Sequence, residues 1–291
     1  METVLVTGAT GLLGSSLVPL LKVRGYEVIT HARSGDADFL ADLSVTDEVF
    51  KLLDKTRPDI IINLAGLTDV DRCEALPSQA YSANVHTLEN IVNWIRQKNT
   101  HCHLVHISTD MVYDGVSPHT EDTVSLTNYY AFSKYAGELA AASAPSTILR
   151  TNFFGRSHCA ERTSLTDWLF RSLSNSDTIQ VFDDVLFSPL AMDTLSNMIE
   201  LTIRKKPVGV FNLGTHGGMS KADFAFAFAE ELNLSAGVMT RTSTDQVTFL
   251  KTYRPKDMRM ECSKFENTLT IKLPSLRNEI KRVAKEYYEE A

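Results

Sequence analysis

The chain of 291 residues has no apolar run that approaches the roughly 20 residues needed to cross a membrane. It also has no internal repeat, low-complexity segment or long linker. Basic residues are not in excess, because 29 Lys and Arg stand against 36 Asp and Glu and give a net charge of −7. This balance excludes a general nucleic-acid binder but allows local arginines to bind an anionic nucleotide. We therefore expect a protein with a large core and no nucleic-acid or membrane partner.

Cysteine is scarce and shows no Cys-x-x-Cys spacing, which predicts thiols of a reducing compartment rather than a disulfide framework. The four are Cys73, Cys102, Cys159 and Cys262. The amino terminus reads as a strand without a basic leader, so we expect a cytoplasmic protein. His101 and His103 alternate as on one side of a strand and His106 follows three residues later, but no array of acids or cysteines completes a metal site. We therefore expect no metal.

A glycine-rich run from Gly8 to Gly14 directly follows the apolar stretch Val4-Leu5-Val6. Continuous apolar sequence is typical of a parallel strand buried on both faces. After such a strand, Gly8 permits a tight turn, Gly11 leaves room for a phosphate and Gly14 lets the next helix pack closely. Alone, this run is also compatible with a glycine-rich turn between any strand and helix. In this position it predicts a binding site for a dinucleotide pyrophosphate.

The segments that follow complete a βαβ unit, with a helix from Leu12 to about Val23 and a strand from Glu27 to Thr30. The second strand leads into Arg33 without the acidic residue that NAD sites usually place there. Arg33 can pair with a 2′-phosphate, which favours NADPH, with NADH as the alternative. The other interpretation of Arg33 is a solvated loop charge. Asp42-Leu43, after the next apolar stretch, would flank the adenine.

A possible acid follows more than a hundred residues later, where Tyr130 and Lys134 stand four residues apart. On a helix they share one face, so the ammonium can stabilise a phenolate and make Tyr130 a proton donor to a carbonyl near neutral pH. The spacing is common by chance and gains weight from the strand expected over 103–108. That strand ends in Ser108 and Thr109 at the carboxyl edge of the sheet, where ligands bind. Either hydroxyl can align a substrate carbonyl, or simply stabilise a turn.

Strands and helices alternate as far as Arg150, which is typical of a parallel sheet with right-handed crossovers. The expected helices are 46–55, 78–96 and 128–142, and the expected strands are 59–63, 103–108 and 147–150. Later segments are mixed, with helices over 165–173, 193–203 and 221–231 and strands over 178–182 and 208–213. We therefore expect an α/β fold: a Rossmann-type doubly wound sheet in an NADP-binding domain of residues 1–155, and a smaller mixed α/β substrate-binding lobe of residues 156–291, parts of which return to the main domain.

Several motifs together resemble the extended short-chain dehydrogenase/reductases, and within them the dTDP-4-dehydrorhamnose reductases. The matching segments are 8–14, 57–63, 68–74, 108–115, 128–138, 149–151, 254–255, Arg259 and 263–265. The resemblance extends nearly end to end, and its specificity comes from the order and spacing of the motifs. It implies NADPH-dependent reduction of the C4 keto group of a nucleotide-linked 6-deoxy-4-keto sugar, above all dTDP-4-dehydrorhamnose to dTDP-rhamnose. It leaves the oligomeric state open, with a homodimer as one assembly to consider.

The resemblance also implies roles for particular residues. The catalytic residues would be Thr109, Tyr130 and Lys134, with Tyr130 protonating the C4 oxygen and Lys134 also holding the nicotinamide ribose. With the residues argued above, the cofactor-binding set is Gly8, Thr10, Gly11, Leu12, Leu13, Gly14, Arg33, Asp42, Leu43, Ala65, Gly66, Asn84, Tyr130 and Lys134. The substrate-binding set is Thr68, Ser108, Thr109, Phe153 and Arg254. Arg254 and Arg259 would supply the positive charge for the nucleotide, or else are surface charges near a loop proline.

The chain departs from the family pattern at four positions expected beside the substrate. Phe153 stands where Trp is common, Met111 where Tyr or Trp is common, and Met258 and Met260 where Ser and Leu are common. The sugar and its nucleotide carrier therefore stay open.

Two other functions stay open as well. One is a non-catalytic NADP-binding regulatory subunit, resembling that of methionine adenosyltransferase, and the other is a nucleotide-sugar epimerase or dehydratase. Retention of the three catalytic residues favours an enzyme. Met111 after Asp110 disfavours a dehydratase, which would be expected to have Asp-Glu there.

Overall fold

A seven-stranded parallel sheet forms the centre of the computed structural model, which describes residues 2–98, 101–159 and 162–288. The strand order is β11-β6-β5-β4-β1-β2-β3. The strands are β1 (Thr3–Thr7), β2 (Glu27–Ala32), β3 (Phe39–Leu40), β4 (Ile60–Asn63), β5 (His103–Ile107), β6 (Ser146–Thr151) and β11 (Gly209–Leu213). The order reverses between β1 and β4, and ligands bind at the carboxyl ends of strands beside such a reversal. The expected Rossmann-type sheet is confirmed.

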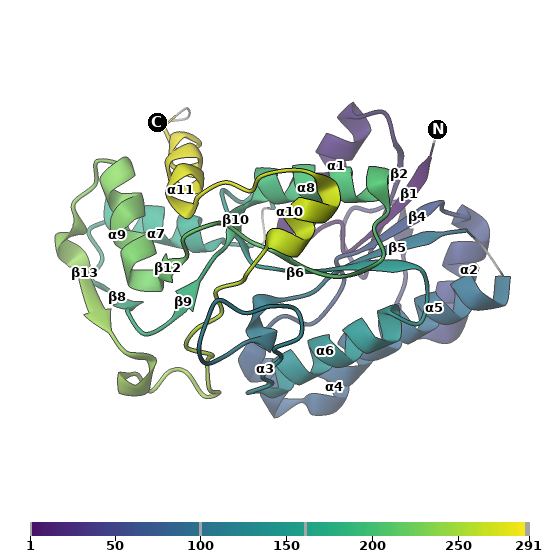
Figure 1. The fold of residues 1–291 in the computed structure, drawn as a ribbon, viewed down its shortest axis with the longest axis horizontal. Coiled ribbons are helices and arrows are strands. Elements are labelled where there is room, and N and C mark those ends of the chain that lie inside the picture. Colours follow the sequence, from purple (N-terminus) through teal and green to yellow (C-terminus); the bar gives the residue numbers. More distant parts are fainter. Residues whose placement is uncertain (1, 99–100, 160–161, 289–291) are drawn as a thin grey trace.

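Helices cover both faces of this sheet (Figure 1). One face carries α1 (Leu12–Val23), α8 (Met192–Lys205) and α10 (Ser263–Leu269), and the other carries α2 (Thr46–Thr56), α5 (Thr87–Lys98) and α6 (Tyr129–Ala141). Successive side chains of a strand point to opposite faces, so Val4 and Val6 of β1 join one core cluster and Leu5 joins another. This two-sided burial accounts for the continuous apolar sequence of β1.

The remaining elements form a smaller body, at the left of Figure 1. They are α7 (Leu165–Ser174), β8 (Ile179–Phe182), β9 (Leu186–Phe187), β12 (Met219–Ser220), α9 (Lys221–Glu231), η3 (Ala236–Val238), β13 (Met239–Thr242), η4 (Thr244–Gln246) and α11 (Leu276–Lys285). Phe224 and Phe228 of α9 are fully buried in its core. A short parallel pair is formed by β7 (Phe153–Phe154) and β10 (Leu190–Ala191).

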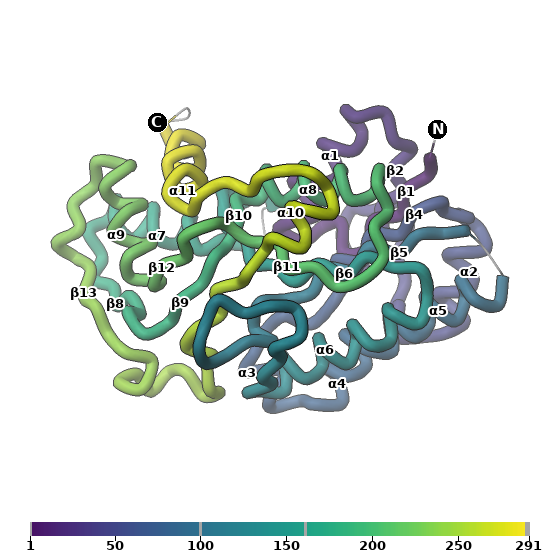
Figure 2. Tube along the Cα trace, viewed as in Figure 1, coloured from purple at the N-terminus to yellow at the C-terminus, as the bar shows by residue number. Residues whose placement is uncertain are grey.

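The chain does not divide cleanly at Gly155. Beyond that residue, β11 pairs with β6 of the main sheet, and α8 packs against α1 (Figure 2). Residues 156–288 thus contribute to both bodies. We still propose a domain boundary near Gly155, with β11 and α8 of the second part returning to the main sheet.

One predicted helix is wrong in its details. Residues 77–98 form α4 (Pro77–Tyr81), a π-helical turn η1 (Ser82–His86) and then α5, instead of one regular α-helix. The π-turn contains Asn84, whose side-chain amide bonds both the main-chain N–H and the carbonyl of Leu67, at 2.7 and 3.0 Å. Such turns are frequent at functional sites, and tertiary contacts rather than local propensity maintain this one.

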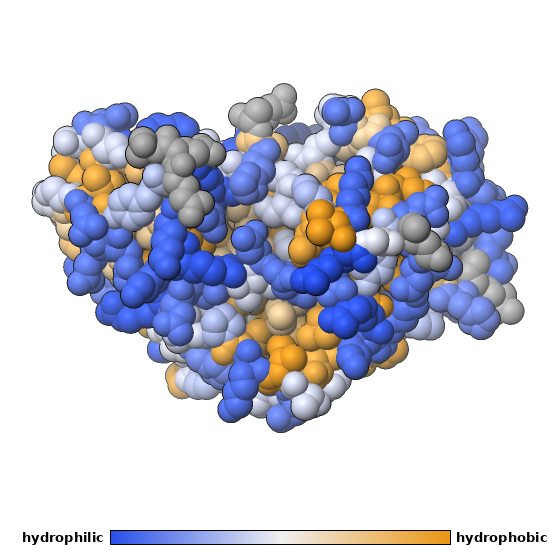
Figure 3. Space-filling model, turned by 90° about the horizontal axis from the view of Figure 1, so that it is seen from above, coloured by the Kyte–Doolittle hydropathy of each residue, from blue (hydrophilic) through white to orange (hydrophobic). Residues whose placement is uncertain are grey.

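Three α-helices in the described residues were not predicted, α3 (Val70–Ala75), α10 and α11, and neither was the short 3₁₀ turn η2 (Asp110–Val112). Among these residues, no helix is both long enough and apolar enough to traverse a bilayer. Seen from above, hydrophilic residues cover most of the surface, and apolar residues form separate patches (Figure 3).

Candidate active site

The loop between β1 and α1 has the backbone geometry of a phosphate cradle. Gly8 has φ +68°, which L side chains rarely adopt, and a Cβ there would lie 2.9 Å from the Ala65 nitrogen. A Cβ at Gly14 would overlap the main chain of Ala9. Gly11 is the N-cap of α1 and provides no side-chain acceptor for the first N–H groups of the helix. These groups and the helix dipole suit a pyrophosphate, so the residues present fit a dinucleotide.

Arg33 lies at the rim of this cradle. It is exposed and directly follows β2. Its loop lies beside the glycine loop, since a Cβ on Gly35 would be 3.7 Å from Thr10 Cγ2. Asp42 accepts hydrogen bonds from Ser44, which lower the pKa of its carboxyl, while Leu43 is buried in the core. Of the three residues predicted to bind the cofactor at this rim, Arg33 is therefore the one that presents a positive charge to solvent.

The segment after β4 forms the opposite wall, at the carboxyl edge beside β1. Ala65 lies against Gly8, and the Ala65 N–H donates to the Thr7 hydroxyl at 3.4 Å. Gly66 leaves space for Asn84, because a Cβ on Gly66 would be 2.8 Å from the Asn84 side-chain oxygen. Asn84 is 2% exposed and also donates to the Ser133 hydroxyl on α6 at 2.9 Å. It thereby joins the wall of the predicted cofactor channel to the helix that carries Tyr130.

Thr109 and Tyr130 meet at the carboxyl edge of β5. The Thr109 hydroxyl accepts a hydrogen bond from the Met111 N–H at 3.1 Å and so fixes the start of η2. Asn128 caps α6 by accepting from the Ala131 N–H at 2.8 Å, which places Tyr130 in the first turn. Burial raises the pKa of Tyr130 above its ordinary value, and the neighbouring Thr109 hydroxyl partly offsets that rise.

The Lys134 amine bonds the main chain, whereas the four-residue spacing predicts a contact with the Tyr130 phenol. Its amine donates to the Ile107 carbonyl at 2.8 Å, and burial lowers its pKa to about 8. The pKa of Tyr130 is raised, not lowered, because burial dominates and because the nearby Asp110 disfavours a phenolate. The amine is therefore bonded to the main chain in this arrangement, and its effect on the acidity of Tyr130 stays a prediction. Four-residue spacing fixes the helix face but not the partner of a long, flexible amine.

Ser108 belongs to a buried ionic network. Its hydroxyl donates to Glu138 at 2.5 Å, and Glu138 forms an ion pair with Arg150 at 2.7 Å. Arg150 also donates to the Tyr113 hydroxyl at 2.7 Å. Glu138 and Arg150 are each 2% exposed, so this charge pair is compensated internally. The Ser108 proton is thus already engaged, and Thr109 is the hydroxyl of the pair that faces Tyr130.

The residues predicted for the substrate are spread over both bodies. Thr68 is exposed after β4, and Phe153 is half-buried in β7. Arg254 lies beside α3, where its guanidinium pairs with Asp71 at 2.9 Å. Arg259 pairs with Asp257 at 2.6 Å.

Of the four departures from the family pattern, the three methionines have different surroundings. Met111 is half-buried and contacts the core of the smaller body as well as the cluster around Tyr130. Met258 and Met260 are 1% and 6% exposed and pack in the two main cores. These last two fill hydrophobic cores, and their place beside the substrate stays a prediction.

Asp110 was not among the predicted site residues, although it follows Thr109 directly. It is 1% exposed, and its carboxylate accepts from the Asn152 amide at 2.8 Å. The Thr109 hydroxyl lies 3.4 Å from its other oxygen. Burial raises the pKa of Asp110 to about 6. The sequence shows that a carboxyl follows the threonine at the end of the strand, but it does not show that this carboxyl is buried.

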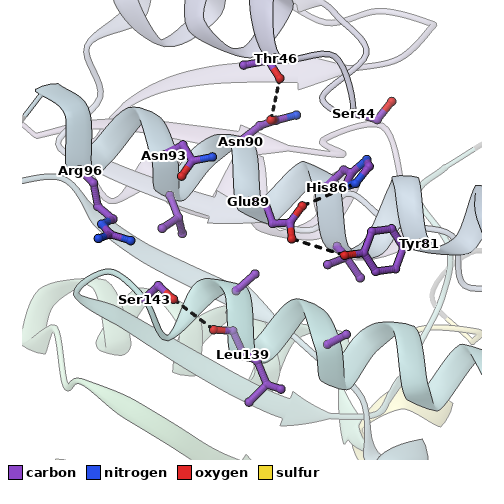
Figure 4. Close-up of a pocket in the computed structure, with 14 residues that line it drawn as sticks. Ser44, Thr46, Tyr81, His86, Glu89, Asn90, Asn93, Arg96, Leu139 and Ser143 are labelled. Carbon is purple, nitrogen blue, oxygen red and sulfur yellow. Dashed lines mark hydrogen bonds and ion pairs between the residues drawn. The ribbon is translucent and has the colours of Figure 1, made fainter.

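A groove of about 590 Å³ lies elsewhere, between the start of α2 and the helices α5 and α6 (Figure 4). Its polar pairs include Thr46 with Asn90 at 3.0 Å and His86 with Glu89 at 3.6 Å. None of the residues that line it is Thr109, Tyr130 or Lys134. The predicted catalytic residues therefore lie outside this groove.

Comparison with known proteins gives one family and a consistent set of relatives. The family model described as RmlD substrate binding domain matches residues 1–289. A dTDP-4-dehydrorhamnose reductase from Aggregatibacter actinomycetemcomitans is 29% identical, with 97% of this chain and 98% of that protein covered. A dTDP-4-keto-6-deoxy-D-glucose reductase from Streptomyces niveus is 33% identical, with coverage of 74% and 73%.

A solved structure agrees along nearly the whole chain. The dTDP-4-dehydrorhamnose reductase from Bacillus anthracis in complex with NADP superposes with a TM-score of 0.88. It is 26% identical, and the match covers 98% of this chain and 99% of that one.

Proposed function

Since the chain belongs to the RmlD substrate binding domain family, we propose that it uses NADPH to reduce the C4 keto group of a nucleotide-linked 6-deoxy-4-keto sugar, with dTDP-4-dehydrorhamnose as the substrate. The family and the fold expected from the sequence are confirmed. The chain is an oxidoreductase of the kind found among its relatives, which include one named for dTDP-4-dehydrorhamnose and one named for dTDP-4-keto-6-deoxy-D-glucose. The identity of the sugar and of its nucleotide carrier belongs to the proposal.

The cofactor site is built from the β1–α1 loop and its neighbours. Gly8, Gly11 and Gly14 would hold the pyrophosphate against the start of α1, and Arg33 would pair with the 2′-phosphate. The wall formed by Ala65 and Gly66 would lie beside the nicotinamide half. When bound, NADPH supplies the hydride. The solved relative from Bacillus anthracis contains NADP, which supports this cofactor.

The chain's own part in the reaction is to orient the ketone and supply a proton. Thr109 would hydrogen-bond the C4 oxygen, and the Tyr130 phenol would give it a proton as negative charge develops there. Lys134, with a pKa near 8, is an amine that would hold a ribose hydroxyl and support the proton transfer. The observation that carries this proposal is the meeting of Thr109 and Tyr130 at the edge of the sheet that also carries the glycine cradle.

The test compares Tyr130→Phe with Tyr129→Phe. Oxidation of NADPH is followed with dTDP-4-dehydrorhamnose, and NADPH binding is measured separately. Tyr130→Phe should reduce kcat by roughly 10²- to 10⁴-fold while NADPH still binds, because only the proton donor is lost. Tyr129→Phe removes a neighbouring hydroxyl outside the catalytic set and should retain activity. An unchanged kcat in Tyr130→Phe would rule out this acid, and a panel of dTDP-, UDP-, GDP- and CDP-linked ketones would test the substrate.

A further inference from the structure

We propose that Asn128 is a positioning residue for Tyr130, because its side chain joins the start of α6 to a strap of residues 252–256 that connects the smaller body to the main one. This inference rests on the proposed function and deepens it by naming what holds the proton donor in place. The sequence motif at the start of this helix includes Asn128 but gives it no role.

The Asn128 amide makes hydrogen bonds to both segments. Its oxygen accepts from the Ala131 N–H at 2.8 Å and so caps α6, and its nitrogen donates to the Tyr253 carbonyl at 3.2 Å. The residue is buried, with 8% of its surface exposed. An amide accepts on one side and donates on the other, so the bond to Tyr253 holds it in the orientation that caps the helix. Tyr130 lies in the turn that this cap fixes.

The strap is anchored in the smaller body at its far end. In Figure 1 the chain passes from β13 through the small helix at the lower left and then runs towards α3. The Lys256 carbonyl accepts from the Leu186 N–H of β9 at 2.7 Å. The Lys256 amine contacts the Asp184 carboxylate at 2.5 Å. A shift of the smaller body would therefore move the strap.

Two carboxylates of the main body also bond the strap. Asp71 of α3 accepts from the Thr252 N–H at 3.0 Å and pairs with Arg254 at 2.9 Å. Asp114, which follows η2, accepts from the Tyr253 hydroxyl at 2.9 Å. Together with the amide described above, these groups hold the strap against three separate segments of the main body.

The helix α3 provides a second connection from the strap to the surroundings of Tyr130. Glu74 of α3 accepts from the Tyr129 N–H at 2.9 Å, and so satisfies another free N–H group at the start of α6. Val70 and Cys73 of α3 pack in the hydrophobic cluster that contains Tyr130. The strap thus contacts the first turn of α6 directly and, through α3, the cluster around the phenol.

The position of a proton donor matters because it must lie within hydrogen-bond reach of the ketone oxygen. A displacement of about 1 Å can lower the rate by on the order of 100-fold. Loss of the connection between Asn128 and the strap should therefore lower kcat without weakening the cofactor, which the glycine loop would hold elsewhere.

The experiment compares Asn128→Ser with the matched change Asn175→Ser. A serine at position 128 still caps α6, since serine and asparagine are similar N-caps, but it has no amide to reach the Tyr253 carbonyl. Asn128→Ser should lower kcat with dTDP-4-dehydrorhamnose roughly 10-fold and leave the Kd for NADPH unchanged. Asn175 is exposed at the end of α7, so Asn175→Ser should match the wild type in both measurements.

Hydrogen exchange followed by mass spectrometry measures the coupling without any substrate. In Asn128→Ser the Thr252 amide should exchange faster than in the wild type, because the strap is held less firmly. The Ala131 amide should keep its protection, because the cap remains. Unchanged exchange of the strap would overturn the coupling, and an unchanged kcat with faster exchange would overturn the positioning role.

A double variant tests whether the strap acts as one unit. Tyr253→Phe removes the hydroxyl that bonds Asp114 but leaves the carbonyl that Asn128 contacts. It should lower kcat by a smaller factor, and its loss should not multiply with that of Asn128→Ser, because both act through the strap. Losses that multiply fully would overturn the connection. The proposed function fails separately, if the wild type reduces no 4-keto sugar while hydrogen exchange shows the strap and α6 coupled.

Discussion

Tyr130 and Lys134 lie one turn apart on α6, yet they have different partners. The Lys134 amine donates to the Ile107 carbonyl at 2.8 Å, whereas the neighbour of the Tyr130 hydroxyl is that of Thr109. Burial raises the pKa of this phenol, and the Thr109 hydroxyl lowers it in part. Thr109 is therefore the neighbour that favours proton release from Tyr130 in this arrangement.

Replacing Thr109 tests this relationship. Thr109→Val keeps the shape of the side chain but removes the hydroxyl, so the phenol becomes a weaker acid and the ketone loses a hydrogen-bond donor. We expect kcat to fall by roughly 10- to 100-fold with little change in NADPH binding. Thr109→Ser keeps the hydroxyl and should retain most of the activity. Full activity in Thr109→Val, measured by steady-state NADPH oxidation, would contradict the role given to this residue.

Asp110 should make stability depend on pH. Its pKa is raised to about 6 by burial, so the folded state holds this proton more tightly than the unfolded state does. The contribution of the group is therefore greatest below pH ~4 and is lost as pH rises through ~6. Asp110→Asn cannot ionise and keeps an acceptor for Asn152. Its free energy of unfolding, relative to wild type, should rise between pH ~4 and ~6 by on the order of 2–3 kcal/mol and then level off.

Denaturant unfolding at several pH values measures this difference. Comparison with the wild type cancels the titration of other carboxyls, including Asp71 and Asp184, whose pKa values are lowered and whose contributions have the opposite sign. A difference between the two proteins that is the same at pH 4 and pH 7 would mean that Asp110 is not buried as described.

The buried pair of Glu138 and Arg150 should matter more for folding than for chemistry. Arg150→Met leaves the Glu138 carboxylate without its cation, which should cost about 3–5 kcal/mol of stability. Glu138→Gln with Arg150→Met removes both charges and should recover part of that loss. Chemical denaturation of the two single variants and the double variant measures the coupling. Additive losses in the double variant would show that the two charges do not depend on each other.

Arg33→Ala tests the choice of cofactor. The exposed guanidinium is expected to pair with the 2′-phosphate, which NADH lacks, so the variant should weaken NADPH by roughly 10-fold and leave NADH nearly unchanged. Lys51→Ala removes an exposed charge from α2 and serves as the control. Fluorescence titration with each nucleotide gives the two affinities. Equal weakening of NADPH and NADH would remove the reason for preferring NADPH.

The sequence by itself determined the elements whose signals are local. The helix expected from Leu12 to Val23 has those bounds in the structure, and the strands on either side of it differ from prediction only at their ends. Glycine positions, apolar runs and helix caps act through residues near in sequence, so spacing suffices to predict them. The family resemblance rested on the same ordered motifs.

Only the tertiary structure decided which groups meet. Arg254 pairs with Asp71, 183 residues away, and Ser108 donates to Glu138 on another element. The π-turn at Asn84 likewise depends on contacts between distant segments, such as its hydrogen bond to Ser133. A charge or hydroxyl in a sequence does not specify its partner, because that partner is chosen by burial and by the packing of elements brought together only when the chain folds.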